Sequence, residues 1–542
     1  MNRRGFVKLL GTAAAGTILT RSLVACGIKN PIQVTIVGAD FKRGHSVRQV
    51  QKSMHFHQTI QVKNIIVGGG ISGLSTAYHL NELGEKDFLL LEMNAEIGGN
   101  SSALKTPYSW APKGAHYLSL PNDDNLPLIA FMQKQQLITG IEDGKYIYNE
   151  RQLCHAPNER LLYRGQFQEG LVPDYGLTEK SIAEIEHFFS WMRILKSVVD
   201  ENGTQQFNIP ASKGAFEMHI NDLDTITFSE FLKERKVTNS ELLWFLDYCC
   251  RDDFGAGMDK VSAWAGVHYF AARKAKPFNA EPTSVLTWPE GNFHLSKLLA
   301  EPVKDKIVKD EVVHEIIETA ENVEVHAYNP VKKSWTKYIA EKAVAACPSY
   351  VSKHILKSEN WPSAFFDGFT HFPWFIGIVT VKKLPETQNG VPLAWDNVKY
   401  GTKGLGYVSN RHQELSKMKG PLVLSVYLTL DEMDAADGRK HLFAMDEAEM
   451  LKRIVDELKG IHPEIEEEIL SVDIQRWGHG MVTPVPGALK KQLAYKELTA
   501  KAKRVFLAHT DYASYSIFEE GFDAGFQAAN NLKGVTSEKQ NG

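Results

Sequence analysis

The sequence predicts an α/β protein with a Rossmann-like, dinucleotide-binding domain near its N-terminus, and three observations support this fold class. An apolar run, Ile65 to Val67, ends on the glycine-rich sequence G-G-G-I-S-G and is followed by an amphipathic stretch. A second apolar run, Phe88 to Leu91, ends on an acidic residue, Glu92. Helical and strand-like segments fill the rest of the 542 residues, which is enough chain for two domains with substantial cores.

The glycines of this motif indicate a backbone that a ligand approaches closely. Gly68, Gly70 and Gly73 have the spacing G-x-G-x-x-G. In such a motif the first glycine makes a tight turn, the second admits a pyrophosphate, and the third lets the helix pack on the strand. The helix predicted from Leu74 to Leu83 would offer free N–H groups and the positive end of its dipole to the phosphates. Glu92 follows Gly73 by nineteen positions, where an acid that binds a ribose hydroxyl pair is expected.

The first 26 residues predict an export signal and not a part of the fold. The run N-R-R-G-F-V-K at positions 2–8 is a twin-arginine pattern, and positions 9–19 are only weakly apolar. The segment ends with L-V-A-C, which resembles a bacterial lipobox with Cys26 as the lipidated residue. We expect export by the twin-arginine machinery and a periplasmic protein held by lipid, with the outer membrane favoured because Gly27 follows the cysteine. The alternative is that Cys26 is an incidental small residue of an uncleaved anchor.

Composition argues against several classes of partner. The formal net charge is -4 and the chain has no long run of Lys or Arg, so nucleic acid is not expected as a partner. After the leader no stretch of eighteen apolar residues occurs, so the mature chain is not expected to span a membrane. His55 and His57 lack an acidic partner nearby, and no metal site is expected there. Four cysteines, too few for a disulfide framework, are interpreted as structural: Cys154, Cys249, Cys250 and Cys347.

The export route bears on the identity of the dinucleotide. The twin-arginine exporter carries folded proteins, and its usual clients acquire a cofactor before they cross the membrane. A freely exchanging NAD would be lost outside the cytoplasm, whereas a tightly held FAD would travel with the protein. We therefore predict FAD at the glycine motif. Because only one dinucleotide fingerprint is present, no NAD(P) site is expected.

Hydrophobic periodicity divides the chain after the leader. Residues 27–62 are predicted to be a linker or N-terminal extension with one strand-like run, Val34 to Val37. Apolar residues recur every three or four positions from Ile182 to Val199, and helical stretches continue from Phe228 to Tyr248, which predicts a mostly helical insertion. We predict an FAD-binding domain made of residues 63–120, 285–350 and 470–535. We predict an α+β substrate domain, which includes this insertion, made of residues 121–284 and 351–469.

Four blocks of sequence resemble the flavin-containing amine oxidase superfamily, which includes monoamine and polyamine oxidases, L-amino acid oxidases and relatives of phytoene desaturase. The blocks are the glycine motif with Glu92, the pair Gly98-Gly99, the segment W-P-E-G-N-F-H-L followed by Val313, and the closing F-L-A-H-T-D with E-E-G-F-D-A-G-F-Q-A-A. They span nearly all of the mature chain. The resemblance implies an FAD-binding domain of the glutathione-reductase type, assembled from three separated pieces of chain.

The resemblance also implies which residues hold the cofactor. The pyrophosphate would lie on the glycine motif, and the ribose of the adenosine would lie on Glu92. The residues implied to contact FAD are Gly68, Gly70, Ser72 and Gly73 at the pyrophosphate, Glu92 at the ribose, Gly98, Gly99 and Asn100 at the pyrophosphate and ribityl region, Gly114, Ala115 and His116 under the isoalloxazine, Val313 at the adenine, and Asp511 near the phosphate or ribityl chain.

The chain departs from the family around the reacting centre. Amine oxidases normally present two aromatic rings that steer a neutral amine to the flavin, and here Trp477 and His479 take the place of one ring while Ile517 falls at the other. His479 is the first candidate for moving a proton near neutral pH, followed by His116 and His509. Tyr515 is a candidate for stacking on the substrate. Asp252 and Asp253 are adjacent in sequence and are predicted to lie in a solvated turn.

The leading interpretation is an FAD-dependent oxidoreductase that transfers a hydride from an amine or amino acid to flavin N5, giving an imine that water hydrolyses. Oxygen or a quinone would reoxidise the flavin. Two alternatives stay open at this point. One is a desaturase or isomerase of a lipophilic substrate, and the other is a flavin-bearing or binding scaffold without turnover.

Overall fold

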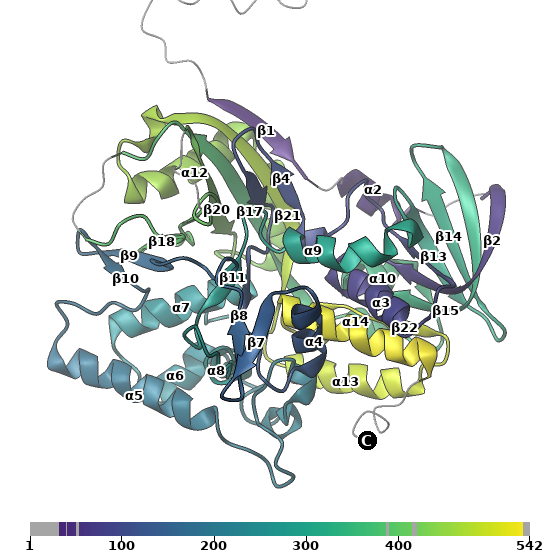
Figure 1. The fold of residues 1–542 in the computed structure, drawn as a ribbon, viewed down its shortest axis with the longest axis horizontal. Coiled ribbons are helices and arrows are strands. Elements are labelled where there is room, and N and C mark those ends of the chain that lie inside the picture. Colours follow the sequence, from purple (N-terminus) through teal and green to yellow (C-terminus); the bar gives the residue numbers. More distant parts are fainter. Residues whose placement is uncertain (1–31, 39–40, 50–53, 386–389, 415–419, 535–542) are drawn as a thin grey trace, which may run out of the picture.

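A computed structural model describes residues 32–38, 41–49, 54–385, 390–414 and 420–534. The predicted leader, including both arginines and Cys26, lies outside the described residues. The described chain forms two large β-sheets beside each other, with a group of helices packed below the left-hand sheet in Figure 1. This arrangement confirms the predicted α/β class.

The first sheet carries the glycine motif. Its strands lie in the order β12-β3-β2-β15-β14-β13-β16, and β22 also pairs with β15. Strands β12, β3, β2, β15 and β22 run parallel, while β13 and β14 form an antiparallel meander with β15. The bounds are β2 (Phe56–Val67), β3 (Phe88–Leu91), β12 (Ile307–Val308), β13 (Val312–Glu318), β14 (Val323–Asn329), β15 (Ser334–Ala345), β16 (Leu356–Lys357) and β22 (Val505–Leu507).

Burial on both faces explains why the parallel strands are continuously apolar. Ile65 and Ile66 of β2 are fully buried, and Leu90 and Leu91 of β3 are at most 1% exposed. Helices α3 (Ile71–Glu82) and α14 (Phe518–Lys533) pack against each other beside this sheet. Helix α3 begins at Ile71, earlier than the predicted Leu74, because the glycine motif itself forms its first turn.

The second sheet is mostly antiparallel and has the order β1-β21-β17-β20-β19-β18-β9-β10. Helices α11 (Ala435–Ala444) and α12 (Glu447–Ile461) pack against it, and the apolar face of α12 supplies Ile454 and Leu458 to its core. The bounds of the strands are β1 (Gln33–Val37), β9 (Glu159–Tyr163), β10 (Gln166–Glu169), β17 (Thr370–Val381), β18 (Asp396–Lys399), β19 (Tyr407–Ser409), β20 (Leu422–Thr429) and β21 (Ile469–Thr483).

The predicted helical insertion is present as four helices with a common apolar core. They are α5 (Glu179–Leu195), α6 (Phe228–Glu234), α7 (Ser240–Phe254) and α8 (Ala263–Ala271). The remaining elements are α2 (Phe41–Ser46), α4 (Leu126–Lys134), α9 (Phe293–Ala300), α10 (Ser349–Ile355), α13 (Ala488–Lys501), β4 (Ala103–Lys105), β5 (Trp110–Pro112), β6 (Tyr117–Ser119), β7 (Ile138–Glu142), β8 (Lys145–Tyr148) and β11 (Val285–Thr287).

Two predicted boundaries differ from the structure. Strand β21, predicted within the piece 470–535 of the FAD-binding domain, pairs with β17 of the second sheet over most of its length. The predicted linker 27–62 contains β1, which belongs to the second sheet, and the start of β2, which belongs to the first. Both segments cross between the two sheets, so hydrophobic periodicity along the sequence does not mark the border.

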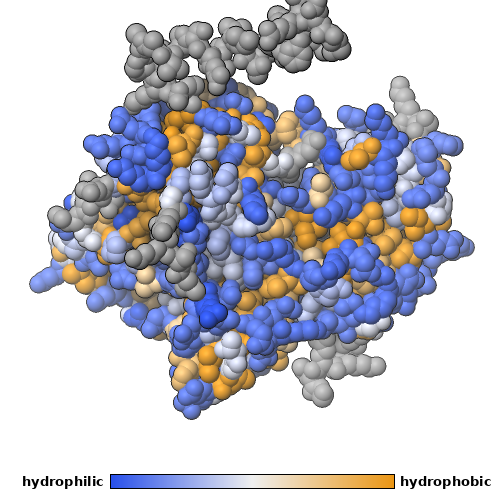
Figure 2. Space-filling view, turned by 45° about the horizontal axis from the view of Figure 1, so that its top comes forward, coloured by the Kyte–Doolittle hydropathy of each residue, from blue (hydrophilic) through white to orange (hydrophobic). Residues whose placement is uncertain are grey.

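The surface is mostly hydrophilic on the face shown in Figure 2, with apolar residues in scattered patches. Within the described part of the chain, no helix has both the length and the apolar character needed to cross a membrane.

Candidate active site

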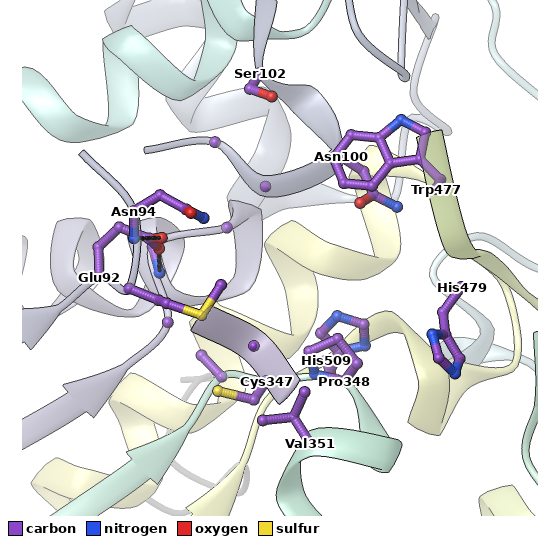
Figure 3. A pocket seen from close by; sticks show the side chains of 18 of the residues that line it. Glu92, Asn94, Asn100, Ser102, Cys347, Pro348, Val351, Trp477, His479 and His509 are labelled. Atoms are coloured by element: carbon purple, nitrogen blue, oxygen red, sulfur yellow. Dashed lines mark hydrogen bonds between the residues drawn. The ribbon is translucent and has the colours of Figure 1, made fainter. Parts of the chain in front are cut away.

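A cavity of about 670 Å³ lies between the two sheets, at the ends of β2 and β3. Its walls come from segments far apart in the sequence. Figure 3 shows Glu92 and Asn94 at one end of this cavity and Asn100 with Trp477 at the other. The lining residues come mainly from 67–72, 91–102, 311–313, 346–348, 350–351, 354–355, 476–482, 509–511 and 516–518, together with residues before β2.

The glycine motif forms one wall, and its geometry excludes side chains at two positions. Gly68 has a φ of +111°, and a Cβ there would lie 2.4 Å from the carbonyl oxygen of Ala346. A Cβ on Gly73 would lie 1.9 Å from the carbonyl oxygen of Gly68, so helix and strand approach each other closely. A Cβ on Gly70 would meet no atom within 4 Å, because this glycine faces the cavity. The motif therefore packs tightly on one side and stays open on the other.

The N-terminus of α3 faces the same cavity. Gly70 is the residue before the helix and provides no side-chain cap, and Ser72 in the first turn lines the cavity. The first N–H groups of a helix have no partner within it, and the helix dipole makes this end attractive to anions. The turn can therefore hold a diphosphate, as predicted for Gly68, Gly70, Ser72 and Gly73.

Glu92 stands at the end of β3 and is held by the backbone. Its carboxylate accepts hydrogen bonds from the N–H groups of Gly69 at 2.7 Å and Asn94 at 2.8 Å. The side chain is 7% exposed, and burial raises its pKa although both N–H groups oppose this effect. The carboxylate lines the cavity where a ribose is predicted.

A second acid, which the sequence did not reveal, lies beside Glu92. The N–H of Glu311 donates to the carbonyl of Glu92 at 2.9 Å, and Val313 follows on β13. One carboxylate oxygen of Glu311 accepts from Asn329 at 3.0 Å, while the other is buried without a partner among the described residues. An unsatisfied buried acceptor in a cavity wall fits a ligand with hydroxyl or amino donors, such as an adenosine. Val313, which is predicted to lie at the adenine, lines the same cavity.

The paired glycines join this wall to the far end of the cavity. The N–H of Gly98 donates to the carbonyl of Gly69 at 2.8 Å, and Gly99 lies against Gly70. Asn100 then bridges the two sheets, because its side-chain amide donates to the carbonyl of Gly480 at 2.6 Å.

The segment predicted to pass under the isoalloxazine meets Asn100. The N–H of Ala115 donates to the carbonyl of Asn100 at 3.0 Å, and Gly114 lies directly on the same carbonyl. Asn100, Ala115 and Trp477 line both the large cavity and a smaller one beyond it. The uncapped helix, the unsatisfied acid and the glycine-lined path together fit FAD along the large cavity.

Asp511 is buried in this wall, and several groups of the protein contact its carboxylate. One of its oxygens accepts hydrogen bonds from the N–H and hydroxyl of Ser349, both at 2.7 Å, and from His371 at 3.0 Å. The other lies 3.0 Å from Nδ1 of His509. Burial alone would raise the pKa of Asp511, but His371 and His509 outweigh it and hold this pKa well below its usual range. Asp511 lines the cavity as predicted, with its oxygens engaged by the protein.

The smaller, inner cavity has a volume of about 120 Å³ and combines aromatic rings with charged groups. The aromatic residues that line it are His116, Tyr117, Trp374, Tyr427 and Trp477. The charged residues that line it are Asp252, Asp253, Arg273 and Glu519.

Asp252 and Asp253 correct the prediction of a solvated turn. They lie in the last turn of α7 and both line the inner cavity. Asp253 is 6% exposed, and its carboxylate accepts from the hydroxyls of Tyr117 at 3.3 Å and Tyr515 at 2.5 Å. Asp252 has no hydrogen bond or ion pair with any described residue. Burial, together with the charges of Asp253 and Glu159, raises the pKa of Asp252 to about 8.

Arg273 does not neutralise this pair directly. Its guanidinium forms an ion pair with Glu519 at 3.0 Å and approaches the hydroxyl of Tyr515 at 3.5 Å. Burial raises the pKa of Asp253, and Arg273 only partly opposes this effect. The inner cavity therefore keeps an excess of acidic groups.

The predicted reacting residues fall in different places. Trp477 lines both cavities, and its indole N–H donates to the carbonyl of Lys113. His116 lines the inner cavity with its ring 4.7 Å from that of Tyr427, and burial lowers its pKa to about 4. Trp477 and His116 thus both line the inner cavity.

Two of the predicted catalytic residues are not brought to the inner cavity. His479 lines only the large cavity and stacks on Tyr350 at a ring distance of 3.9 Å. Burial, together with the nearby Arg439, His371 and Arg48, lowers its pKa to about 3. Tyr515 is 1% exposed in the helical core and lines neither cavity, so it supports Asp253 and cannot stack on a substrate. His509 is tied to Asp511.

Comparison with known proteins agrees with this geometry. The family model for flavin containing amine oxidoreductase matches residues 71–533. A redesigned putrescine oxidase has 15% identity and a TM-score of 0.63, with 88% of this chain and 100% of that chain covered. Cyclohexylamine oxidase from Brevibacterium oxydans IH-35A has 14% identity and a TM-score of 0.59, covering 87% of this chain and 98% of its own. A CLA-producing fatty acid isomerase from P. acnes has 14% identity and a TM-score of 0.59, with 86% of this chain and 97% of that chain covered.

These solved structures share the fold, and their names cover more than one chemistry. The family match begins at Ile71, within the glycine motif, and it includes Gly73, the paired glycines and Asp511. The predicted resemblance and the predicted cofactor are thereby confirmed. The chain belongs to the flavin containing amine oxidoreductase family and is an FAD-dependent oxidoreductase.

Proposed function

We propose that this enzyme oxidises an amine whose nitrogen enters the inner cavity as an ammonium ion. The observation that carries the proposal is the unbalanced charge of that cavity. Asp252 and Asp253 both line it, and among the described residues around it Arg273 is the only lysine or arginine, already paired with Glu519. An ammonium ion would supply the missing positive charge. The names of putrescine oxidase and cyclohexylamine oxidase also point to amines.

Asp252 is suited to prepare the amine. An amine must lose its ammonium proton before the carbon beside the nitrogen can give up electrons, and alkyl ammonium groups have pKa values near 10. Because the pKa of Asp252 is raised to about 8, its carboxylate is a far better proton acceptor than an ordinary one. Asp253, held by Tyr117 and Tyr515, keeps its position while Asp252 changes charge.

The aromatic walls orient the substrate and exclude water. Trp374, Trp477 and Tyr427 line the inner cavity, and such rings give apolar contacts to the carbon atoms next to the nitrogen. FAD, when bound, supplies the acceptor for two electrons and for the hydrogen that leaves this carbon. Loss of that hydrogen converts the amine to an imine, and water hydrolyses it to a carbonyl compound and an amine or ammonium. Oxygen or a quinone would then take up the electrons.

The size and charge of the cavity bear on the alternatives. A cavity of about 150 Å³ in another protein accepts benzene. The 120 Å³ found here suits the head of an amine and not a whole lipid chain. The aromatic walls favour a desaturase or isomerase of a lipophilic substrate as the second candidate. A fatty carboxylate, however, would meet repulsion from Asp252 and Asp253.

The test uses the purified holoprotein without oxygen. Mixing with primary amines, diamines, amino acids or unsaturated fatty acids should bleach the visible absorbance of the flavin only with amines. Asp252→Asn and Asp253→Asn should each slow bleaching at least about tenfold, since a lost charge contact to an ammonium is worth roughly 1.5–3 kcal/mol. Asp259→Asn is the matched control, because this exposed residue pairs with Lys260 outside the cavity. Bleaching by none of the amines would refute the proposal.

We further propose that the chain is exported folded, with FAD bound, and anchored by lipid at Cys26 in the periplasm. The support is the twin-arginine pattern and the lipobox-like sequence L-V-A-C. The double change Arg3→Lys and Arg4→Lys should hold the protein in the cytoplasm, and Cys26→Ser should abolish partition into detergent. Normal export of the double variant would contradict the proposal.

A further inference from the structure

We propose that residues 32–38 and 41–49, called here the strap, are part of the FAD site and hold the cofactor in place. The strap precedes the family match, which begins at residue 71. It consists of β1, the edge strand of the second sheet, and α2, which lies between the two sheets in Figure 1. Seven of its residues line the large cavity: Gly38, Phe41, Arg43, Gly44, His45, Val47 and Arg48.

One end of the strap is fixed to the second sheet. Strand β1 pairs in parallel with β21 in continuous register from Gln33 opposite Ser471 to Val37 opposite Gln475. At Gly38 the chain leaves the strand with a φ of +110°, and a Cβ there would lie 1.6 Å from the side-chain oxygen of Gln475. Only glycine lets the strap turn this closely against β21 and toward the cavity.

The other end is fixed to the first sheet, next to the predicted ribose site. The guanidinium of Arg43 donates to the carboxylate of Asp310 at 2.7 Å and to the carbonyl of Met93 at 3.2 Å. Met93 directly follows Glu92, and the N–H of Asp310 donates to the carbonyl of Asn94 at 3.3 Å. Arg43 therefore closes the strap over the loop that carries the ribose-binding acid.

Between these ends the strap is held by aromatic packing. The ring of Phe41 lies 5.0 Å from that of Phe443 on α11. The guanidinium of Arg476 lies over both rings, at 5.7 Å from Phe41 and 5.3 Å from Phe443. Arg476 also lines the large cavity. The strap thus joins the two sheets across the space that FAD occupies.

The charge of the strap fits the cofactor. Its described residues include Lys42, Arg43 and Arg48 and none that is acidic. Arg48 lines the cavity, and its guanidinium has no hydrogen bond or ion pair with any described residue. A diphosphate is anionic, so a basic segment across its cavity adds attraction to the contacts of the glycine motif. Release of FAD would therefore require the strap to detach.

The first experiment measures how fast the holoprotein releases FAD after dilution, from the fluorescence of the free flavin. Arg43→Met removes both contacts to Asp310 and Met93 and should speed release about tenfold, as expected for a partly buried, charge-assisted bond. Asp310→Asn should have a similar effect, and the double variant should add little to either single one. The matched control is Lys496→Met, which breaks an exposed ion pair with Glu217, and neither of these residues lines the cavity. Release from Arg43→Met at the unchanged rate would overturn the proposal.

The second experiment cuts the strap in the intact holoprotein. Trypsin can cleave after Lys42, Arg43 and Arg48, and mass analysis follows these cuts over time. We expect FAD to leave the protein with the same time course as the cleavage of the strap. Full retention of FAD after the strap has been cut would overturn the proposal, even if the point variants fold poorly.

Discussion

Replacing Glu92 tests how the glycine motif and the ribose site depend on one carboxylate. In Glu92→Ala the N–H groups of Gly69 and Asn94 both lose their acceptor in a site that is 7% exposed. Each buried donor left without a partner costs roughly 1–3 kcal/mol, so the free energy of unfolding should fall by about 2–6 kcal/mol. Loss of a charged acceptor for a ribose hydroxyl should also raise the Kd for FAD about 10- to 100-fold.

The assay separates binding from folding. Titration with FAD, followed by quenching of its fluorescence, gives the Kd, and thermal melting at fixed FAD gives the stability. Glu85→Gln is the matched control, because Glu85 is a buried acid of the same domain that accepts from Lys63 at 2.8 Å outside the cavity. It should lower the melting temperature and leave the Kd unchanged. An unchanged Kd in Glu92→Ala would refute the assigned ribose contact.

Three further predictions concern the glycine motif and the inner cavity. Gly73→Ala places a Cβ 1.9 Å from the carbonyl oxygen of Gly68, so it should destabilise the holoprotein by about 1–3 kcal/mol or more in thermal melting. The pKa of Asp252 is raised to about 8, so its carboxylate is protonated below that pH and ionised above it. The affinity for a quaternary ammonium ion, which cannot be oxidised, should therefore rise as the pH increases through 8, as measured from perturbation of the flavin spectrum. Tyr515→Phe removes a hydrogen bond that lowers the pKa of Asp253 and should shift the pH profile of flavin bleaching upward without changing the FAD content.

The glycine motif and Glu92 were predictable because short-range sequence patterns specify them. A strand, a turn that excludes Cβ atoms and a helix N-terminus follow one another within a short stretch, and each has a sequence signature. Phe88–Leu91 was predicted with its exact bounds, and Glu92 lies at its end in the structure. The strand-like run Val34 to Val37 was predicted and lies in β1, but the place of the strap was not predictable, because β1 pairs with β21, more than 400 residues later, and no local pattern carries that information.

The inner cavity was not predictable for a related reason. Adjacent residues on a helix point about 100° apart, which suggested that Asp252 and Asp253 do not act together. The structure places both in the last turn of α7, where the helix ends at Gly255 and both side chains reach the cavity. His479 was the first candidate for proton transfer, but the sequence does not show that its ring stacks on Tyr350 and lines only the large cavity.

The two cavities are built on different physical principles, and this difference links structure to function. The large cavity is shaped by close backbone contacts, and it leaves the uncapped start of α3 and one oxygen of Glu311 open to a ligand. In the inner cavity burial and the charge of Asp253 disfavour the ionised form of Asp252, and repulsion between the two carboxylates grows as the pH rises through about 8. Both lie at the C-terminal end of α7, where the helix dipole is also negative. Hydrogen bonds from Tyr117 and Tyr515 hold Asp253 but leave Asp252 without a partner among the described residues. A cation relieves this repulsion on binding. The ligand that fits the inner cavity best is therefore one that carries a positive charge.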